Sequence, residues 1–502
     1  MQSEPGSESR RPVHSSDPRT GEPGVQVAVE SGPEQVDRAV RAAAAAAPAL
    51  ADRAVRAALL RAAADRLAAA AEEVIAAADA ETALGVPRLT GELARTTYQL
   101  RSFAEQVEQG AFLDVAIDRA DPALGRPDLR RMKVPLGVVA VFAASNFPLA
   151  FSVPGGDTAS ALAAGCPVVV KAHPDHPATS ELCARLVREA AAGLGLPEDV
   201  LGLLHGFDAG PELVRHPLVA AVGFTGSVRG GRALHDIAAA RPRPIPFHGE
   251  LGSLNPVVVT ERAAAERAAE IGAGLAGSFT LGSGQFCVKP GLVLIPAGAG
   301  ELEQEVVTAA AKAATGPLLD PRMRAAFLAG VQDRAARPGV QTLLAAGPAD
   351  TAPLAVTPGV LAVAAAELSE ELLEECFGPV TLLVRYRDAD ELDGVLGQLS
   401  GNLTATVHLA EDERGPEAVA LLGRLLPLAG RLVVDGWPTG VAVAPAMHHG
   451  GPYPASTSTS TSVGATAIER WLRPVSYQNT PPELLPAELH DTNPLGVPQR
   501  IN

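Results

Sequence analysis

The sequence is poor in cysteine, tryptophan and lysine. Its 502 residues include four cysteines and two tryptophans. The cysteines are Cys166, Cys183, Cys287 and Cys376. None of them forms a CxxC pair or lies beside a histidine at zinc-finger spacing. A small fold stapled by disulfides is therefore excluded, and a reducing, cytoplasmic setting is expected.

Long apolar runs and an excess of positive charge are also missing. No apolar stretch reaches the ~20 residues that a membrane-spanning helix needs. The 57 acidic side chains outnumber the 41 basic ones, and the net charge is −16, whereas nucleic-acid and anionic membrane surfaces favour basic proteins. The N-terminal 24 residues lack the apolar core of a secretory signal. We expect a soluble protein with no nucleic-acid and no membrane partner.

What the sequence has is an alternation of apolar strands and helices. Alanine-rich helices broken near Pro48 are predicted over residues 36–81. Short valine-rich runs are typical of buried parallel strands, and they occur at 134–145, 166–171, 200–206, 218–227 and 255–260. The order strand, helix, strand, helix predicts an α/β protein with an open parallel sheet. The length suggests two or three domains.

Three residues are candidates for catalysis. Cys287 lies in LGSGQFCVKPG, where glycines and a lysine could support a thiolate, so it is the best nucleophile candidate among the cysteines. Glu250, in PFHGELGSLNP, is either a general base or a buried structural carboxylate. Asn146 follows an apolar strand and is either an oxyanion donor or a helix N-cap.

Two further segments could hold a nucleotide. FTGSVRGG places Gly226, Ser227 and Gly231 between a strand and a helix, where backbone N–H groups can bind phosphate, although the glycines could simply permit a turn. Lys171 ends the strand CPVVVK, where it could contact a ribose or remain a surface lysine. HPDH at 173–176 contains a proline and has no third ligand in view, so no metal site is predicted.

Taken in order, these segments resemble the aldehyde dehydrogenase superfamily from about residue 133 to 478. The motifs that carry the resemblance are SNFP, CPVVVK, FTGSVRGG, ELGSLNP, GQFC and EECFGP. The resemblance implies that Cys287 is the nucleophile, Glu250 the general base and Asn146 the oxyanion donor. The implied nucleotide-binding residues are Lys171, Gly226, Ser227, Gly231, Glu375 and Phe377.

The variant details resemble one branch of that family. SNFP in place of PWNFP, together with GWPTGV, MHHGGPYPAST and RPVSYQN, is similar to the α-ketoglutarate semialdehyde (2,5-dioxovalerate) dehydrogenases. Val228 and Ser253 depart from the usual FTGST and ELGG. Pro174 stands where NAD-preferring members often have a glutamate, so NADP or NAD is expected as cofactor, with NADP favoured.

The resemblance also implies an architecture. A doubly wound nucleotide-binding domain is expected over 25–112 and 135–248, with an α/β catalytic domain over 249–445. Residues 113–134 and 465–480 are expected to form an oligomerisation arm of a homodimer or homotetramer. Residues 1–24 are predicted to be a flexible lead and 481–502 a C-terminal tail.

The implied reaction is oxidation of an aldehyde to a carboxylate through a thiohemiacetal and a thioester on Cys287. For the branch named above, the small-molecule substrate is 2,5-dioxopentanoate and the product 2-oxoglutarate. A long-chain or general aliphatic aldehyde dehydrogenase is the alternative within this class. A thiol esterase that uses Cys287 and Glu250 without a nucleotide, and a scaffold without activity, are alternatives of other classes.

Overall fold

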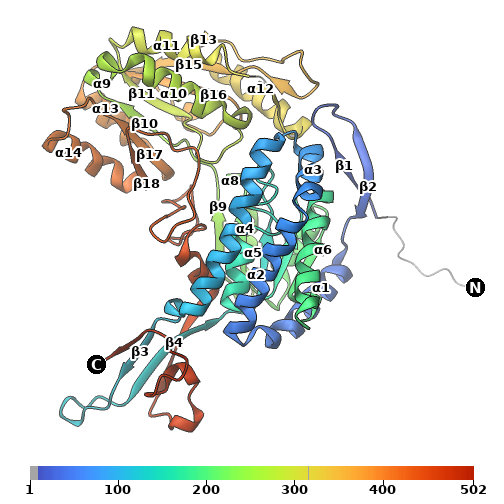
Figure 1. Cartoon of the computed structure of the whole chain (residues 1–502). Helices are drawn as coiled ribbons and strands as arrows, with labels where there is room; N and C mark the ends of the chain where they lie inside the picture. Colours follow the sequence, from blue (N-terminus) through green and yellow to red (C-terminus); the bar gives the residue numbers. More distant parts are fainter. Residues whose placement is uncertain (1–9, 315) are drawn as a thin grey trace, which may run out of the picture.

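The computed structural model describes residues 10–314 and 316–502. Its centre is formed by a five-stranded and a seven-stranded sheet, each covered by helices on both faces, and a thin four-stranded sheet projects from one end (Figure 1). The mixed α/β architecture predicted from the alternating pattern is confirmed. No helix in the described part of the chain has the length and apolar character to cross a membrane.

The five-stranded sheet is entirely parallel, with the order β7-β6-β5-β8-β9. Its strands are β5 (Val138–Phe142), β6 (Val168–Lys171), β7 (Leu201–Leu204), β8 (Val219–Thr225) and β9 (Phe247–Glu250). The first two strands are wholly buried, as their runs of valine predict. Strand order reverses next to β5, and open α/β sheets bind ligands outside the carboxyl ends of the strands at such a point.

Helices cover both faces of this sheet. They are α1 (Pro33–Ala46), α2 (Arg53–Ala69), α3 (Ala71–Thr82), α4 (Val86–Gln109), α5 (Gly156–Ala164), α6 (Pro177–Gly193), α7 (Ala209–Arg215) and α8 (Val228–Ala239). One core joins α1, α7 and α8 to the sheet, and another joins α5 and α6, over which α2 and α4 pack. The break predicted near Pro48 is confirmed, because α1 ends at Ala46 and a 3-10 turn precedes α2.

The seven-stranded sheet has the order β13-β15-β16-β11-β10-β17-β18, and only β13 runs antiparallel to its neighbour. Its strands are β10 (Val257–Val259), β11 (Leu292–Pro296), β13 (Gln341–Leu344), β15 (Gly359–Ala364), β16 (Val380–Tyr386), β17 (Asn402–His408) and β18 (Ala429–Val434). The helices around it are α9 (Glu261–Glu266), α10 (Ala268–Thr280), α11 (Gly300–Ala310), α12 (Pro321–Ala335), α13 (Ala389–Leu396) and α14 (Pro416–Leu425). The expected boundary between 248 and 249 falls inside β9, which completes the first sheet.

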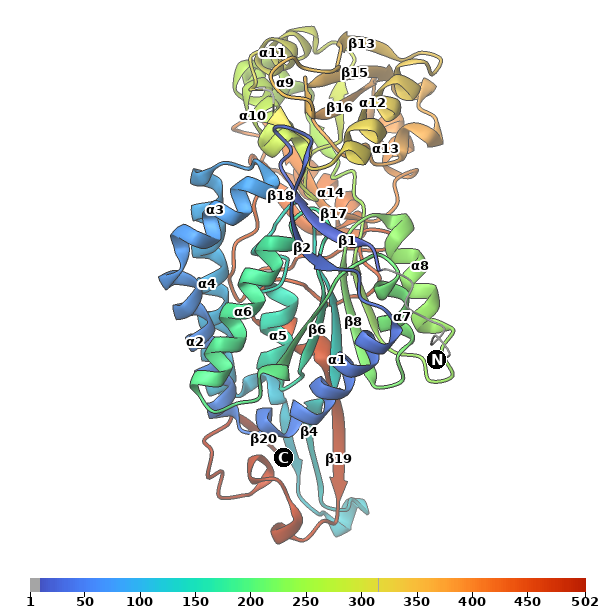
Figure 2. The ribbon, with the colours of Figure 1, turned by 90° about the vertical axis from the view of Figure 1, so that its right-hand side faces the viewer.

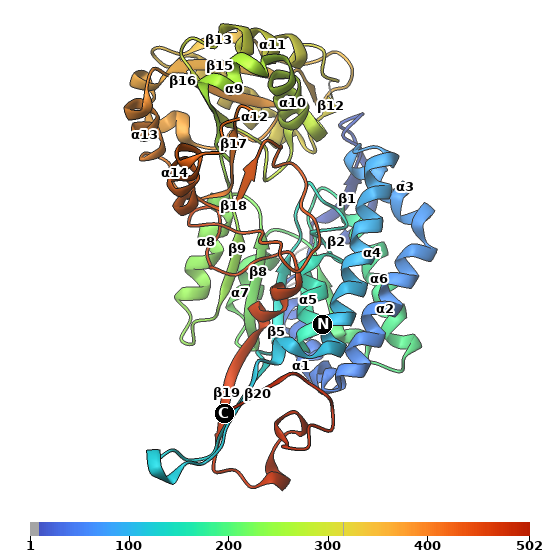
Figure 3. The same cartoon turned by 60° about the vertical axis from the view of Figure 1, so that its left-hand side comes forward.

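The projecting sheet, whose strands β19 and β20 are labelled in Figure 3, has the order β19-β4-β3-β20. The strands are β3 (Val115–Asp118), β4 (Leu129–Pro135), β19 (Leu472–Gln478) and β20 (Gln499–Ile501). Residues 113–134 and 465–480, which the resemblance assigns to one arm, both contribute strands to this sheet. The segment expected to be a tail packs onto the same sheet, because β20 pairs in parallel with β3.

The N-terminal segment differs from the sequence prediction. Residues 1–9 lie outside the described residues, but β1 (Pro12–Ser16) pairs antiparallel with β2 (Pro23–Val29) and forms a ribbon beside α6 (Figure 2). A salt bridge of 2.7 Å from Arg19 to Asp79 fixes the connecting turn to α3. This contact joins residues 60 positions apart, so local composition gave no signal for it.

Candidate active site

A cavity of about 320 Å³ lies at the carboxyl edge of the five-stranded sheet. The predicted residues that line it are Asn146, Gly226, Ser227, Glu250, Cys287, Glu375 and Phe377. They come from the ends of β5, β8 and β9 and from two loops of the seven-stranded sheet. Of the predicted site residues, Lys171 and Gly231 do not line this cavity. The structure therefore brings together groups that are up to 231 positions apart in the sequence.

Cys287 lies in the loop between α10 and β11. Its carbonyl oxygen accepts a hydrogen bond of 2.8 Å from the side-chain amide of Asn255, and its Sγ lies 3.7 Å from Nε2 of His449. Burial raises the pKa of the Cys287 thiol to about 12, and the nearby carboxylates Glu250 and Glu375 raise it further. The sulfur is therefore a protonated thiol until a base takes its proton.

A glycine fixes the approach to that cysteine. Gly284 has φ +69, and a Cβ there would lie 2.3 Å from the backbone of Gly378. Only glycine tolerates both the left-handed conformation and the close contact. The glycine-rich segment before Cys287 thus lets two loops touch, rather than serving as a free flexible turn.

Asn146 lies beside the nucleophile loop. Its Nδ2 donates a hydrogen bond of 2.8 Å to the carbonyl of Gln285, two residues before Cys287. A primary amide has two N–H groups, so one further donor remains for an oxyanion at the sulfur. The carbonyl of Asn146 accepts a bond of 2.6 Å from Arg88 on α4, which fixes the loop.

Glu250 ends β9 and is 4% exposed. Its Oε2 accepts a hydrogen bond of 2.9 Å from Ser456, and its Oε1 lies 3.6 Å from a guanidinium nitrogen of Arg470. Burial raises the pKa of Glu250 to about 8, although Arg470 and Ser456 oppose the rise. A carboxyl group with that pKa can exchange a proton with water near neutral pH.

Glu375 approaches from the opposite loop. A Cβ on Gly252 would lie 2.7 Å from its Oε2, so the glycine makes room for this carboxylate. Burial raises the pKa of Glu375 to about 7, and Lys289 opposes the rise. Glu375 and Phe377 both line the cavity.

The predicted nucleotide residues lie at the same sheet edge. Ser227 caps α8 by accepting a bond of 3.2 Å from the amide of Gly230. At Gly231 a Cβ would lie 2.2 Å from Leu251, so the glycine permits close packing of α8 against the loop after β9. Lys171 is buried, and burial lowers its pKa to about 8. A cap, a free helix N-terminus and a buried amine fit a phosphorylated ligand.

Sequence reasoning missed several functional groups. His449 contacts Cys287, Arg470 and Ser456 contact Glu250, and Asn255 holds the carbonyl of Cys287. The histidine pair in MHHGGPYP was part of the branch motif, but nothing local assigned it to the sulfur. His449 is fully buried, and burial lowers its pKa to about 3, so it is a neutral imidazole.

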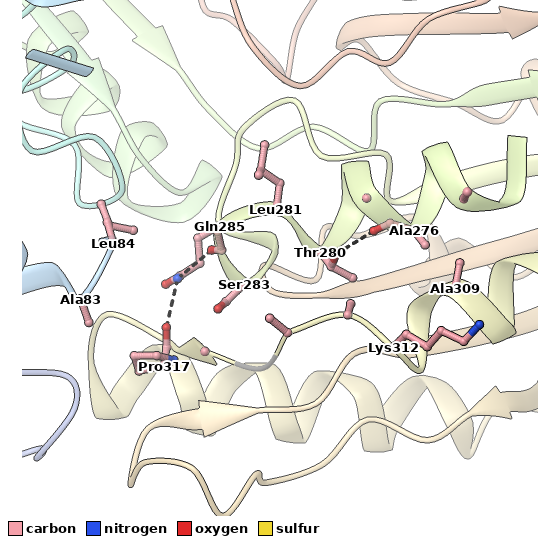
Figure 4. Close-up of a pocket in the computed structure, with 16 residues that line it drawn as sticks. Ala83, Leu84, Ala276, Thr280, Leu281, Ser283, Gln285, Ala309, Lys312 and Pro317 are labelled. Carbon is pink, nitrogen blue, oxygen red and sulfur yellow. Dashed lines mark hydrogen bonds between the residues drawn. The ribbon is translucent and has the colours of Figure 1, made fainter. Parts of the chain in front are cut away.

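A second cavity, of about 550 Å³, lies between α10, α11 and the loop before α4 (Figure 4). Alanines and glycines form most of its wall, and Nε2 of Gln285 donates to the carbonyls of Gly282 at 3.1 Å and Pro317 at 3.5 Å. None of the predicted site residues lines this cavity. Its described residues include Lys312 and Thr280 but no cysteine, histidine or carboxylate.

Comparison with known proteins shows the family to which the chain is similar. The model of the aldehyde dehydrogenase family matches residues 5–420. Alpha-ketoglutaric semialdehyde dehydrogenase 2 of Azospirillum brasilense is 50% identical over 449 residues, which are 88% of this chain and 85% of that protein. Alpha-ketoglutaric semialdehyde dehydrogenase of Acinetobacter baylyi is 42% identical over 431 residues, which are 84% of this chain and 82% of that protein.

Solved structures share the fold. A mutant of aldehyde dehydrogenase C from Pseudomonas syringae, complexed with NAD+ and octanal, has a TM-score of 0.81 and 22% identity, and the match covers 96% of each chain. Proline utilization A of Bradyrhizobium japonicum has a TM-score of 0.78 and 24% identity over 89% of this chain. The match spans 45% of that larger protein.

Proposed function

The chain belongs to the aldehyde dehydrogenase family, and from that premise we propose that it oxidises 2,5-dioxopentanoate to 2-oxoglutarate with NADP or NAD. One observation carries the substrate: two relatives that are 50% and 42% identical over most of their lengths are named alpha-ketoglutaric semialdehyde dehydrogenases. The cavity that joins Cys287, Asn146 and Glu250 supports the chemistry.

Acylation begins at Cys287. The sulfur adds to the aldehyde carbon as its proton passes to the ionised carboxylate of Glu250, which lines the same cavity. The free N–H of the Asn146 amide and the backbone N–H of Cys287 stabilise the resulting oxyanion. When bound, the nicotinamide cofactor supplies the acceptor for the hydride, and the sulfur then carries a thioester.

Deacylation uses Glu250. Its carboxylate takes a proton from water, and the hydroxide formed attacks the thioester and releases the acid. The residues that would hold the cofactor are Lys171, Gly226, Ser227, Gly231, Glu375 and Phe377. Their helix cap, glycines and acidic group suit the phosphates and ribose of a dinucleotide.

We further propose that NADP is favoured. Two cations share the ring of Phe207, since Lys171 Nζ lies 5.0 Å and Arg322 Cζ 5.2 Å from its centre. Pro174 contributes no carboxylate, and burial raises the pKa of the adjacent Asp175 to about 7. A 2′-phosphate would therefore meet the Lys171 ammonium there, while Arg322 pairs with Asp320 at 3.2 Å. We expect kcat/KM to be higher with NADP than with NAD. A higher value with NAD would contradict the proposed preference.

The oligomeric state is a proposal as well. The sheet β19-β4-β3-β20 projects from the body of the molecule, as an arm that pairs between subunits should. We infer a homodimer or homotetramer. Light scattering coupled to size-exclusion chromatography measures the mass, and a monomer at micromolar concentration would contradict the inference.

One experiment tests the activity. Purified protein is mixed with either nucleotide and with 2,5-dioxopentanoate, pentanal or dodecanal, and reduced nucleotide is followed by absorbance. We expect the highest kcat/KM with 2,5-dioxopentanoate and a loss of at least about a thousandfold in Cys287→Ala. Preference for dodecanal would favour a long-chain aldehyde dehydrogenase. Ester hydrolysis without any nucleotide-dependent oxidation would favour a thiol esterase.

A further inference from the structure

We propose that Arg95, whose two terminal nitrogens are buried without a partner beside the wall of the Cys287 cavity, binds the carboxylate of the substrate. This inference rests on the proposed function and goes beyond it, because it assigns the group that selects aldehydes carrying an acid at the far end of the chain.

Arg95, on α4, does not itself line the cavity but packs against the Phe151 ring, which does. Its Cζ is 5.1 Å from the centre of the Phe151 ring, and Phe151 lines the cavity. Its Nε donates a hydrogen bond of 3.3 Å to the carbonyl of Val441. The side chain therefore bridges α4 and the loop over residues 436–441, with its two Nη groups left for another acceptor.

Those two Nη groups have no hydrogen-bond partner among the described residues, although both are inaccessible to solvent. A buried donor without an acceptor costs about 1–3 kcal/mol, and more when the group is charged. A guanidinium presents its two Nη groups as a planar fork, which matches the two oxygens of a carboxylate. The two unpaired Nη groups are therefore suited to bind the carboxylate of an organic acid.

The charges around the cavity favour the same orientation of substrate. Glu250 and Glu375 both raise the pKa of Cys287, so the two acidic groups lie near the sulfur. Arg431 and Arg95 both lower the pKa of His449, after burial, so two guanidinium groups lie near this histidine of the cavity wall. A substrate with an aldehyde at one end and a carboxylate at the other would place the carboxylate away from the acidic groups and toward the arginines.

Glu92 is an acidic group on the same helix, and its Oε2 has no hydrogen-bond partner among the described residues, so it is not paired with Arg95. Glu92, one turn before Arg95 on α4, accepts hydrogen bonds of 2.9 Å from the amides of Leu149 and Ala150 through Oε1. Arg88 and Arg95 both act on this single carboxylate and oppose the rise that burial causes in its pKa. Glu92 therefore leaves positive charge beside the cavity unbalanced.

The test compares two substrates of equal chain length. We expect Arg95→Met to lower kcat/KM for 2,5-dioxopentanoate about 10- to 100-fold, mainly through KM, and to change pentanal oxidation less than about threefold. The kcat/KM of Arg95→Lys for 2,5-dioxopentanoate should lie between those of the wild type and Arg95→Met, because an ammonium keeps the charge but cannot form the two parallel hydrogen bonds of a guanidinium. Arg101→Met is the matched control: Arg101 lies on α4 and forms an exposed ion pair of 2.8 Å with Asp65.

Binding without turnover gives a second readout. Calorimetry of 2-oxoglutarate with nucleotide-free protein should show affinity in the wild type and a loss of at least about tenfold in Arg95→Met. An equal loss for both aldehydes, or no loss for either, would overturn the role of Arg95. Wild-type protein that oxidises pentanal better than 2,5-dioxopentanoate would instead overturn the proposed substrate.

Discussion

At the residue scale, the chemistry depends on how burial changes proton affinity. Cys287 and Glu250 lie in one cavity, and burial raises both pKa values. A thiol with a pKa near 12 needs a base beside it, and a carboxyl group with a pKa near 8 can act as one once it has lost its own proton. The two raised values therefore describe one coupled proton transfer.

The raised pKa of Glu250 predicts the pH dependence of deacylation. Below about pH 8 the carboxyl is protonated and cannot take a proton from water, so thioester hydrolysis should increase as pH rises through 8. Stopped-flow measurement should show a burst of reduced nucleotide followed by a slower steady state. Glu250→Gln should slow the steady state about 100-fold or more and remove this pH dependence. A wild-type steady-state rate that is constant from about pH 6 to about pH 9 would contradict this role.

His449 predicts a change in the reactivity of the sulfur. Nε2 of His449 lies 3.7 Å from Sγ of Cys287, so the neutral imidazole can accept a hydrogen bond from the thiol. His449→Phe keeps a ring against Phe151 but removes that acceptor, and alkylation of Cys287 by iodoacetamide should slow about three- to tenfold. The neighbouring substitution His448→Phe is the control. Equal rates in both variants would exclude the contact from the activation of the sulfur.

The site residues that could be predicted from the sequence are those that lie within a recognisable local motif. Cys287, Glu250 and Asn146 lie in motifs that resemble a family, and the structure lines one cavity with all three. His449 reaches the sulfur across 162 positions, and Arg95 reaches the carbonyl of Val441 across 346. Contacts of such range depend on how two sheets meet, which no local spacing encodes.

At the scale of elements, Ser253 explains one departure from the family motif. Its hydroxyl donates a hydrogen bond of 2.8 Å to Asn255 Oδ1 and accepts one of 2.9 Å from the amide of Leu403. The loop after β9 is thereby tied to β17. Strands could be predicted from runs of valine, but this link could not, because the serine stands where the pattern has glycine.

Ser253→Ala should destabilise the fold. It leaves the amide of Leu403 without its acceptor, and a buried unpaired donor costs about 1–3 kcal/mol in the free energy of unfolding. Denaturant unfolding measures the difference. The control is Ser152→Ala, since the hydroxyl of Ser152 is buried without a partner among the described residues. Equal stability of both variants would contradict a structural role for the Ser253 link.

At the scale of the whole molecule, one arginine holds the C-terminal segment to the projecting sheet. Arg130 on β4 donates a hydrogen bond of 2.7 Å to the carbonyl of Leu489 and forms a salt bridge of 3.0 Å with Asp491. Both contacts join β4 to residues about 360 positions later. Composition therefore described 481–502 as a tail, while the folded chain places it against the sheet.

Arg130→Met should release that segment and leave the cavity intact. Amide hydrogen exchange over 481–502 should accelerate at least about tenfold, because local unfolding then costs less. The kcat should stay within about twofold of the wild-type value, since the cavity lies at the edge of another sheet. Arg119→Met, which removes only the exposed 3.6 Å contact to Asp491, is the control. Unchanged exchange in Arg130→Met would show that other contacts hold the segment.

The pairing of β20 with β3 leaves the projecting sheet with unequal margins. One margin is β19, with seven residues including Pro474, and the other is β20, with three. So short a strand offers few backbone groups to a neighbouring molecule, and proline interrupts donors on the longer side. Two copies that pair through their β19 strands would each have only the short edge strand β20 left exposed. Association through this sheet would therefore stop at a closed pair and would not continue as an open fibre.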